Sequence, residues 1–164
     1  MDIRRGITLQ ISLLIVLFAS FGSAQSDKNS GLSRFVIYGD TRTNHKVHRQ
    51  VVLAVVDQHP DFIVQTGDLV ANSNSAAQWR NFDRIIEPVR KSNIGYYPAR
   101  GNHDVGKRSK YAEEMPASLH SGNIFYYRFD FQNLRFLALD TESDLSVKSG
   151  QYKWLEKETQ GRQN

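Results

Sequence analysis

The sequence contains no cysteine among its 164 residues. This absence excludes disulfide bonds, cysteine-ligated zinc, iron–sulfur clusters, a thiol nucleophile and a lipoprotein anchor, because each of them needs a thiol. The charge excess is small, since 21 Lys and Arg residues face 17 Asp and Glu, and no run of five or six consecutive basic residues occurs. The charge pattern therefore gives no indication of binding to nucleic acid or to an anionic membrane surface.

Three motifs of common enzyme classes are also missing. The chain has no P-loop, no Gly-x-Gly-x-x-Gly turn and no Gly-x-Ser-x-Gly elbow. P-loop kinases, dinucleotide-binding enzymes and serine hydrolases of the elbow type are therefore without support. Hydrophobic residues at 40% and charged residues at 23% are typical of a globular protein, and the length favours one domain.

The first 24 residues have the pattern of a secretory signal. Arg4 and Arg5 supply the positive start, residues 7–21 are mostly apolar, and residues 22–24 are small enough for cleavage. The alternative is a membrane anchor, but the apolar stretch is shorter than the ~20 residues that a spanning helix needs. We therefore expect an exported protein, periplasmic or secreted, that starts at Gln25 and keeps no stable membrane span.

Residues 25–33 are polar and predict a flexible lead-in, and the domain is expected over residues 34–164. Short apolar runs alternate with amphipathic stretches, which predicts strand–helix–strand units. The expected strands are residues 35–38, 62–64 and 96–99; the expected helices are residues 45–58, with His48 on the polar face, and residues 76–86, with Pro88 as a stop.

The last third of the chain has a different period. Residues 125–131 alternate aromatic and polar side chains, which predicts a strand with one buried face. A turn at residues 132–133 would lead into a second strand at residues 135–139, followed by a helix at residues 151–159. The expected fold class is therefore α/β with a mixed sheet.

Each of the first three predicted strands ends in glycine followed by oxygen-bearing side chains. Asp40, Asp68 and Asn102 stand 28 and 34 residues apart, close to the length of one strand–helix–strand unit. Loops at the carboxyl ends of neighbouring strands converge on one crevice, so these side chains can meet. Two carboxylates and an amide oxygen in one place call for a cation. A single Gly-Asp pair is also a common turn and helix cap, but three pairs at this spacing favour a site.

The motifs Gly39-Asp40, Gly67-Asp68 and Gly101-Asn102-His103-Asp104 resemble the first three motifs of the calcineurin-like metallophosphoesterase superfamily. Residues 136–141 and 151–156 are similar to segments that follow in its purple-acid-phosphatase-like and related bacterial branches. The resemblance runs from about residue 34 to the end of the chain. It implies a four-layer α/β sandwich whose later motifs, a His and a Gly-His-x-His, would lie beyond Asn164, so that the domain is an N-terminal portion, incomplete at its C-terminus.

The resemblance also implies an activity and a set of roles. It implies a hydrolase of phosphomonoesters or phosphodiesters with two metal ions, divalent or of the Fe, Zn or Mn type. Asp40 would bind the first ion, Asp68 would bridge both, and Asn102 would bind the second. His103 would stabilise or protonate the leaving oxygen, and Asp104 would orient His103.

One position departs from most of the superfamily, because Arg42 stands where a histidine ligand is usual. Arginine only donates hydrogen bonds and cannot ligate a cation. Arg42 is expected instead to bind a substrate phosphate or to neutralise a carboxylate in place of a metal. His45 is either a phosphate contact or a solvated residue at a helix start. With three oxygen ligands for two ions, we expect this chain to be a slow hydrolase.

The environment of Arg100 and a function other than catalysis are two further points of interpretation. Arg100 precedes the third motif and is expected to be a surface charge rather than a phosphate contact. A rival to the enzyme is a non-catalytic module that binds phosphate or metal, or an interaction domain that retains only the fold. Substrate, metal identity and oligomeric state do not follow from the residues.

Overall fold

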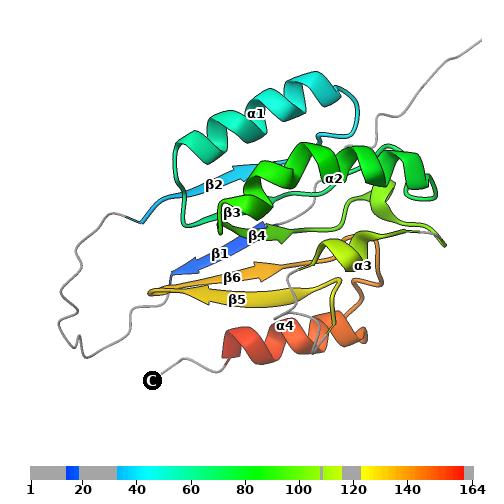
Figure 1. The fold of residues 1–164 in the computed structure, drawn as a ribbon. Coiled ribbons are helices and arrows are strands. Elements are labelled where there is room, and N and C mark those ends of the chain that lie inside the picture. The colour runs from blue at the N-terminus through cyan, green and yellow to red at the C-terminus, as the bar shows by residue number, and fades with distance from the viewer. Residues whose placement is uncertain (1–13, 19–32, 108, 116–122, 161–164) are drawn as a thin grey trace, which may run out of the picture.

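The structure is a computed structural model that describes residues 14–18, 33–107, 109–115 and 123–160. Helices and sheets stack in layers, with α1 and α2 on one sheet, a second sheet beneath it and α4 on the far side (Figure 1). The helices are α1 (His45–Asp57), α2 (Ala76–Lys91), α3 (Tyr111–Glu114) and α4 (Gly150–Gln160). The strands are β1 (Leu14–Phe18), β2 (Phe35–Tyr38), β3 (Phe62–Gln65), β4 (Gly95–Pro98), β5 (Tyr127–Phe131) and β6 (Leu134–Ala138).

The first sheet is parallel and has the order β2-β3-β4. Tyr38 pairs with Gln65 and Gln65 pairs with Pro98, so all three strands end at the same level. Every residue of β3 is buried, as expected for a central strand covered on both faces. The three strand ends therefore open on one edge of the sheet.

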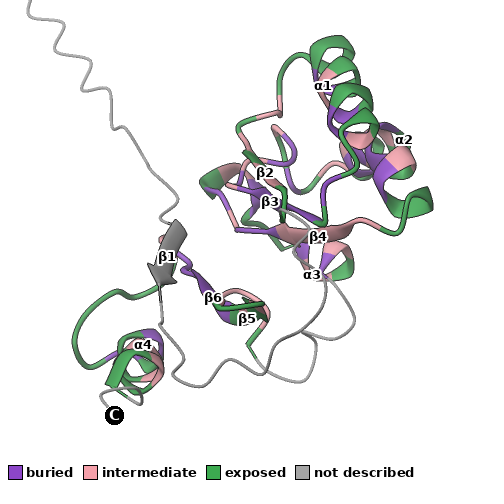
Figure 2. Ribbon diagram, turned by 90° about the vertical axis from the view of Figure 1, so that its left-hand side faces the viewer, coloured by how far each residue is buried: buried purple, intermediate pink, exposed green. Residues whose placement is uncertain are grey.

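Two apolar cores hold the layers together. On the helix side, Trp79, Phe82 and Ile86 of α2 pack with Val52 of α1 over the parallel sheet. Between the sheets, the ring of Phe62 lies 5.2 Å from that of Phe136. Figure 2 shows the buried residues gathered in β3, β6 and the inner faces of the helices. Removing these aromatic surfaces from water is the main stabilisation of the sandwich.

The second sheet is antiparallel, with the order β1-β6-β5. The predicted hairpin is confirmed, since β5 turns into β6 and Phe129 pairs with Phe136. Strand β1 lies inside the predicted signal segment and pairs with β6 from Leu14–Ala138 to Phe18–Leu134. The rest of residues 1–24 and most of the lead-in lie outside the described residues, so the signal and its cleavage stay predictions. No helix in the described part of the chain is both long and apolar enough to span a bilayer.

Helix α2 does not stop before Pro88, as the sequence suggested, but continues to Lys91. Proline lacks the N–H that would bond to the carbonyl of residue 84. In the structure the Arg49 guanidinium of α1 donates to that Arg84 carbonyl at 3.1 Å, and the Ser92 hydroxyl bonds to the Pro88 carbonyl at 2.7 Å. Side chains from outside the helix therefore satisfy the carbonyls, and the helix passes through the proline.

The expectation for His48 was also wrong. His48 is only 3% exposed and lies on the buried face of α1 with Val52 and Val55, at spacings of four and three residues. Its ring is 5.8 Å from that of Tyr38 and 6.1 Å from that of Phe82. Burial lowers the pKa of His48 to about 4, with His45 adding to the effect, so the ring is neutral at pH 7.

Candidate metal centre at the strand ends

The loops that follow β2, β3 and β4 are bonded to one another. The Thr66 N–H donates to the Tyr38 carbonyl at 2.9 Å, and the Asp40 N–H donates to the Gly67 carbonyl at 3.0 Å. The Ala99 N–H continues the pattern to the Gln65 carbonyl at 2.6 Å. These bonds extend the sheet ladder past the strands and hold the three loops side by side.

The backbone at these loops is in a conformation that side chains rarely adopt. Asp40 has φ 54°, Gly67 has φ 101° and Asp68 has φ 60°. Asp tolerates the left-handed region better than most residues, but its use twice in neighbouring loops is typical of functional sites. At Gly101 a Cβ would collide with the carboxylate and the backbone nitrogen of Asp68. Only glycine lets the third loop approach the second this closely.

Arg42 joins the two carboxylates. A single nitrogen, Nη1, forms an ion pair with Asp40 Oδ1 and another with Asp68 Oδ2, the latter at 2.5 Å. The Asp68 side chain is 14% exposed, Arg42 26% and Asp40 73%, so the bridge joins an exposed carboxylate to a mostly buried one. The position between the two carboxylates is thus one that holds positive charge.

The third loop begins as a short 3₁₀ turn over Asn102–Asp104. The His103 N–H donates to Asp68 Oδ1 at 3.1 Å, which places Asn102 and His103 directly beside Asp68. The His103 ring uses Nδ1 to contact the Ala71 carbonyl at 2.8 Å. Because a carbonyl only accepts hydrogen bonds, Nδ1 carries a proton there. Nε2 is then the ring nitrogen that can exchange a proton with a ligand.

Asp104 is fully buried beneath these loops. Its carboxylate accepts from the N–H groups of Asp68 at 2.9 Å, Leu69 at 2.9 Å, Val70 at 3.3 Å and Gly101 at 3.0 Å. Burial raises the pKa of Asp104 to about 6, against the lowering effect of these donors. The carboxylate thus contacts the backbone of the second and third loops, while Ala71 is the residue that contacts the His103 ring.

Arg100 is not the surface charge that the sequence suggested. Its side chain is 12% exposed, and its Nε donates to Asp140 Oδ1 at 3.1 Å, with a second bond from Nη2 to Oδ2. The guanidinium also lies 4.0 Å from the centre of the Phe125 ring. This pairing ties the loop after β4 to the end of β6, which is 40 residues away and therefore invisible to local sequence patterns.

Asp40, Arg42, Asp68, Asn102, His103 and Asp104 together are called the rim site below. Among the described residues no three His, Cys, Asp or Glu side chains group closely enough to hold a metal ion. Asn102, whose loop lies beside Asp68, would add an amide oxygen to the carboxylates of Asp40 and Asp68, and oxygen donors of this kind suit Mg²⁺ or Mn²⁺. The charge already held between the carboxylates shows that the place fits a cation. His45 lies exposed at the start of α1.

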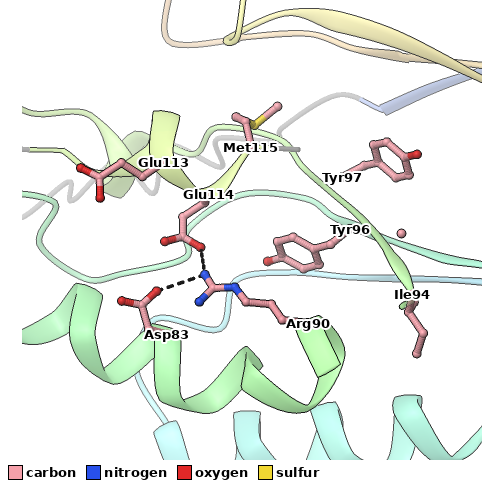
Figure 3. A pocket seen from close by; sticks show the side chains of 9 residues that line it. Asp83, Arg90, Ile94, Tyr96, Tyr97, Glu113, Glu114 and Met115 are labelled. Atoms are coloured by element: carbon pink, nitrogen blue, oxygen red, sulfur yellow. Dashed lines mark hydrogen bonds and ion pairs between the residues drawn. The ribbon is translucent and has the colours of Figure 1, made fainter. Parts of the chain in front are cut away.

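A cavity of about 650 Å³ lies between α2, the start of β4 and α3. Here Arg90 pairs with Asp83 at 3.1 Å and with Glu114 at 2.5 Å, as Figure 3 shows. Asp83, Arg90 and Glu114 are called the α2–α3 cluster below. Burial raises the pKa of Glu114 to about 7, against the opposing effect of Arg90. Sequence patterns gave no signal for this cluster, because none of its residues belongs to a motif.

The family model for calcineurin-like phosphoesterases matches residues 33–163. The chain belongs to this family. The expected resemblance is confirmed, and so is the α/β fold: a purple acid phosphatase from yellow lupin seeds superposes with a TM-score of 0.64, at 23% identity over 79% of this chain and 28% of the lupin chain.

Two curated relatives illustrate the range of the family. A probable inactive purple acid phosphatase 27 of Arabidopsis thaliana is 25% identical over 84% of this chain, and a probable cyclic nucleotide phosphodiesterase of Fibrobacter succinogenes is 30% identical over 60% of it. This chain spans only 27% and 36% of the lengths of those proteins. The family consists of phosphoesterases, and some relatives of this chain are named inactive.

Proposed function

We propose that this protein is an exported hydrolase of phosphomonoesters or phosphodiesters that works with two metal ions at the rim site. The observation that carries the proposal is the convergence of Asp40, Asp68 and Asn102 at one sheet edge, held by strand-end hydrogen bonds and left-handed backbone. Families with this fold host several functions, so the residues of the site, rather than the fold, support this function.

Each residue of the site has a distinct task in this proposal. Asp40 and Asp68 would hold the metal ions with their carboxylates, and Asn102 would add an amide oxygen. Bound metal ions supply Lewis-acid polarisation of the phosphoryl oxygens and an activated water. Asp104 keeps the second and third loops in register through four backbone bonds. His103 keeps its Nδ1 proton on the Ala71 carbonyl; from the doubly protonated ring, Nε2 would give its proton to the leaving oxygen and then take one back from water.

The test is hydrolysis of p-nitrophenyl phosphate, a monoester, and of bis-p-nitrophenyl phosphate, a diester, with Mn²⁺ present. Asp68→Ala is expected to lower turnover by about a hundredfold or more, and His103→Ala by about a hundredfold. Asp83→Ala, in the distant α2–α3 cluster, serves as the charge-matched control and keeps full turnover. Equal rates in all four proteins would overturn the proposal.

A second candidate is a module that binds phosphate or metal without catalysis. It is favoured by one observation, the pairing of Arg42 with both carboxylates. Binding of inorganic phosphate with no turnover of either ester, in a protein that also binds Mn²⁺, would select this function over the hydrolase.

We also propose that residues 1–24 direct export and are removed after Ala24. Support comes from the two arginines, the apolar stretch and the small residues of the segment. Cleavage there would remove β1, one of the two antiparallel partners of β6, and leave β5 as the other. N-terminal sequencing of the exported protein should start at Gln25, and retention of Arg4 and Arg5 would contradict the proposal.

A further inference from the structure

Arg42 places a positive charge between carboxylates of two loops of the rim site. One nitrogen of one guanidinium contacts a carboxylate of the first loop and a carboxylate of the second. Two carboxylates that face each other repel unless a positive charge lies between them. Arg42 supplies that charge from within the chain, and a metal ion bridging Asp40 and Asp68 needs the same place.

The arginine is also free to leave this position without disturbing the core. It stands two residues after Asp40 in the loop between β2 and α1, its side chain is 26% exposed, and its guanidinium bonds are to Asp40 and Asp68. The buried structural bonds of the rim site belong to other groups, chiefly the Asp104 carboxylate. Withdrawal of Arg42 therefore removes charge from the site and leaves its scaffold intact.

We propose that Arg42 is an exchangeable internal counter-ion of the rim site. In the metal-free chain its guanidinium neutralises Asp40 and Asp68, and a divalent cation binds only by displacing it. This inference rests on the proposed function, because it concerns the metal ions of that same site. It predicts that metal affinity is lowered by the competing guanidinium and that an oxyanion raises it, since phosphate gives the displaced guanidinium a new charge-assisted partner.

The first experiment is calorimetric titration of Mn²⁺ into the metal-free full chain and its variants. Arg42→Met removes the competing charge and is expected to tighten Mn²⁺ binding at least tenfold. Arg42→Lys keeps the charge and should stay within about threefold of the parent. Arg80→Met loses one charge at an exposed position of α2 and is the matched control, with unchanged affinity.

Thermal unfolding provides a readout that does not depend on turnover. Metal-free Arg42→Met should melt below the parent, because Asp40 and Asp68 then face each other without a cation. Mn²⁺ should raise its melting temperature by more than it raises that of the parent. If Arg42→Met does not fold, Arg42→Gln, which also removes the charge, takes its place with the same expected results.

The second experiment measures the coupling between phosphate and Mn²⁺. Inorganic phosphate should raise the Mn²⁺ affinity of the parent at least fivefold, and Mn²⁺ should raise phosphate affinity by the same factor. In Arg42→Met the part of this coupling that the arginine carries is lost, so the factor should fall by at least half.

The outcomes separate this inference from the proposed function. Unchanged or weaker Mn²⁺ binding in Arg42→Met overturns the exchange, as does binding in Arg42→Lys that is as tight as in Arg42→Met. The expected order of affinities without any ester hydrolysis supports the exchange and overturns only the hydrolase. Absence of Mn²⁺ binding in every protein overturns both.

Discussion

The rim site and the α2–α3 cluster each contain one arginine that is paired with two carboxylates. In the rim site Arg42 bridges Asp40 and Asp68, and in the cluster Arg90 bridges Asp83 and Glu114. The two lie at different places in the fold, the first on loops after parallel strands and the second on helices α2 and α3 beside the start of β4.

The surroundings make the two triads different. Asp40 and Asp68 have left-handed backbone conformations. Both carboxylate oxygens of Asp68 accept hydrogen bonds, one from Arg42 and one from the His103 N–H. Arg90 is 47% exposed, and its partners lie on ordinary helical backbone. An arginine between two acids is therefore no evidence of a site by itself; converging strand ends and preset backbone donors are what distinguish the rim site.

The largest loss of stability is expected from a substitution in the scaffold of the rim site. Asp104→Ala should destabilise the protein by about 3 kcal/mol or more, because four buried N–H groups lose their acceptor. Urea unfolding measures the loss, with the exposed Asp57→Ala as control. A loss below about 1 kcal/mol would show that the loops hold their positions without Asp104.

The next largest effect is expected at Glu114 of the α2–α3 cluster. Its pKa rises from 4.5 to about 7 on folding, so the folded state holds an extra proton between these values. The resulting stabilisation is complete below pH 4.5 and is lost as the pH rises through 7. Glu114→Gln should remove this dependence, about 3 kcal/mol in all. Unfolding of both proteins at pH 4.5 and pH 8 measures it, and parallel profiles would contradict the prediction.

His48, below the first strand end, should show the opposite slope. Its pKa falls from 6.5 to about 4 on folding, so the folded state binds fewer protons. The stabilisation from the neutral ring is present above pH 6.5 and is lost as the pH falls through 4, again about 3 kcal/mol. His48→Phe keeps a ring beside Tyr38 and Phe82 and should flatten this limb. Denaturation of both proteins from pH 7 to pH 4 measures this. The same loss of unfolding free energy in the parent and in His48→Phe would refute the prediction.

The smallest change is expected for Asp83→Ala. Its side chain is 38% exposed and its bond to Arg90 is 3.1 Å, so its loss should reduce stability by about 0.5 kcal/mol. Arg90 keeps its partner Glu114, which is only 5% exposed. Chemical denaturation in low and high salt measures the loss, and a deficit above 1.5 kcal/mol would mean that the cluster is a tightly coupled unit like the rim site.

Local patterns in the sequence were sufficient for much of the fold. The strands β2 and β3, the hairpin of β5 and β6 and the helices α1 and α4 follow from the period of apolar residues, which reports the geometry of the backbone directly. Of these two strands only β3 is buried throughout; β2, predicted as buried, lies at the edge of the sheet with Ile37 46% exposed. They failed where distant residues decide the outcome. Pro88 stays inside α2 because Arg49 of another helix satisfies the freed carbonyl, and Arg100 is covered because Asp140 lies opposite it.

The sequence by itself determined which residues could form a site. Glycine and an acid or amide at three strand ends, one strand unit apart, place Asp40, Asp68 and Asn102 on one edge, because parallel strands share the direction of their ends. Their pairing, burial and hydrogen bonds depend on the tertiary structure. The pairing of Arg42 with two carboxylates, the burial of His48 and the backbone bonds of Asp104 depend on distances between loops far apart in the chain, and no local period encodes such distances.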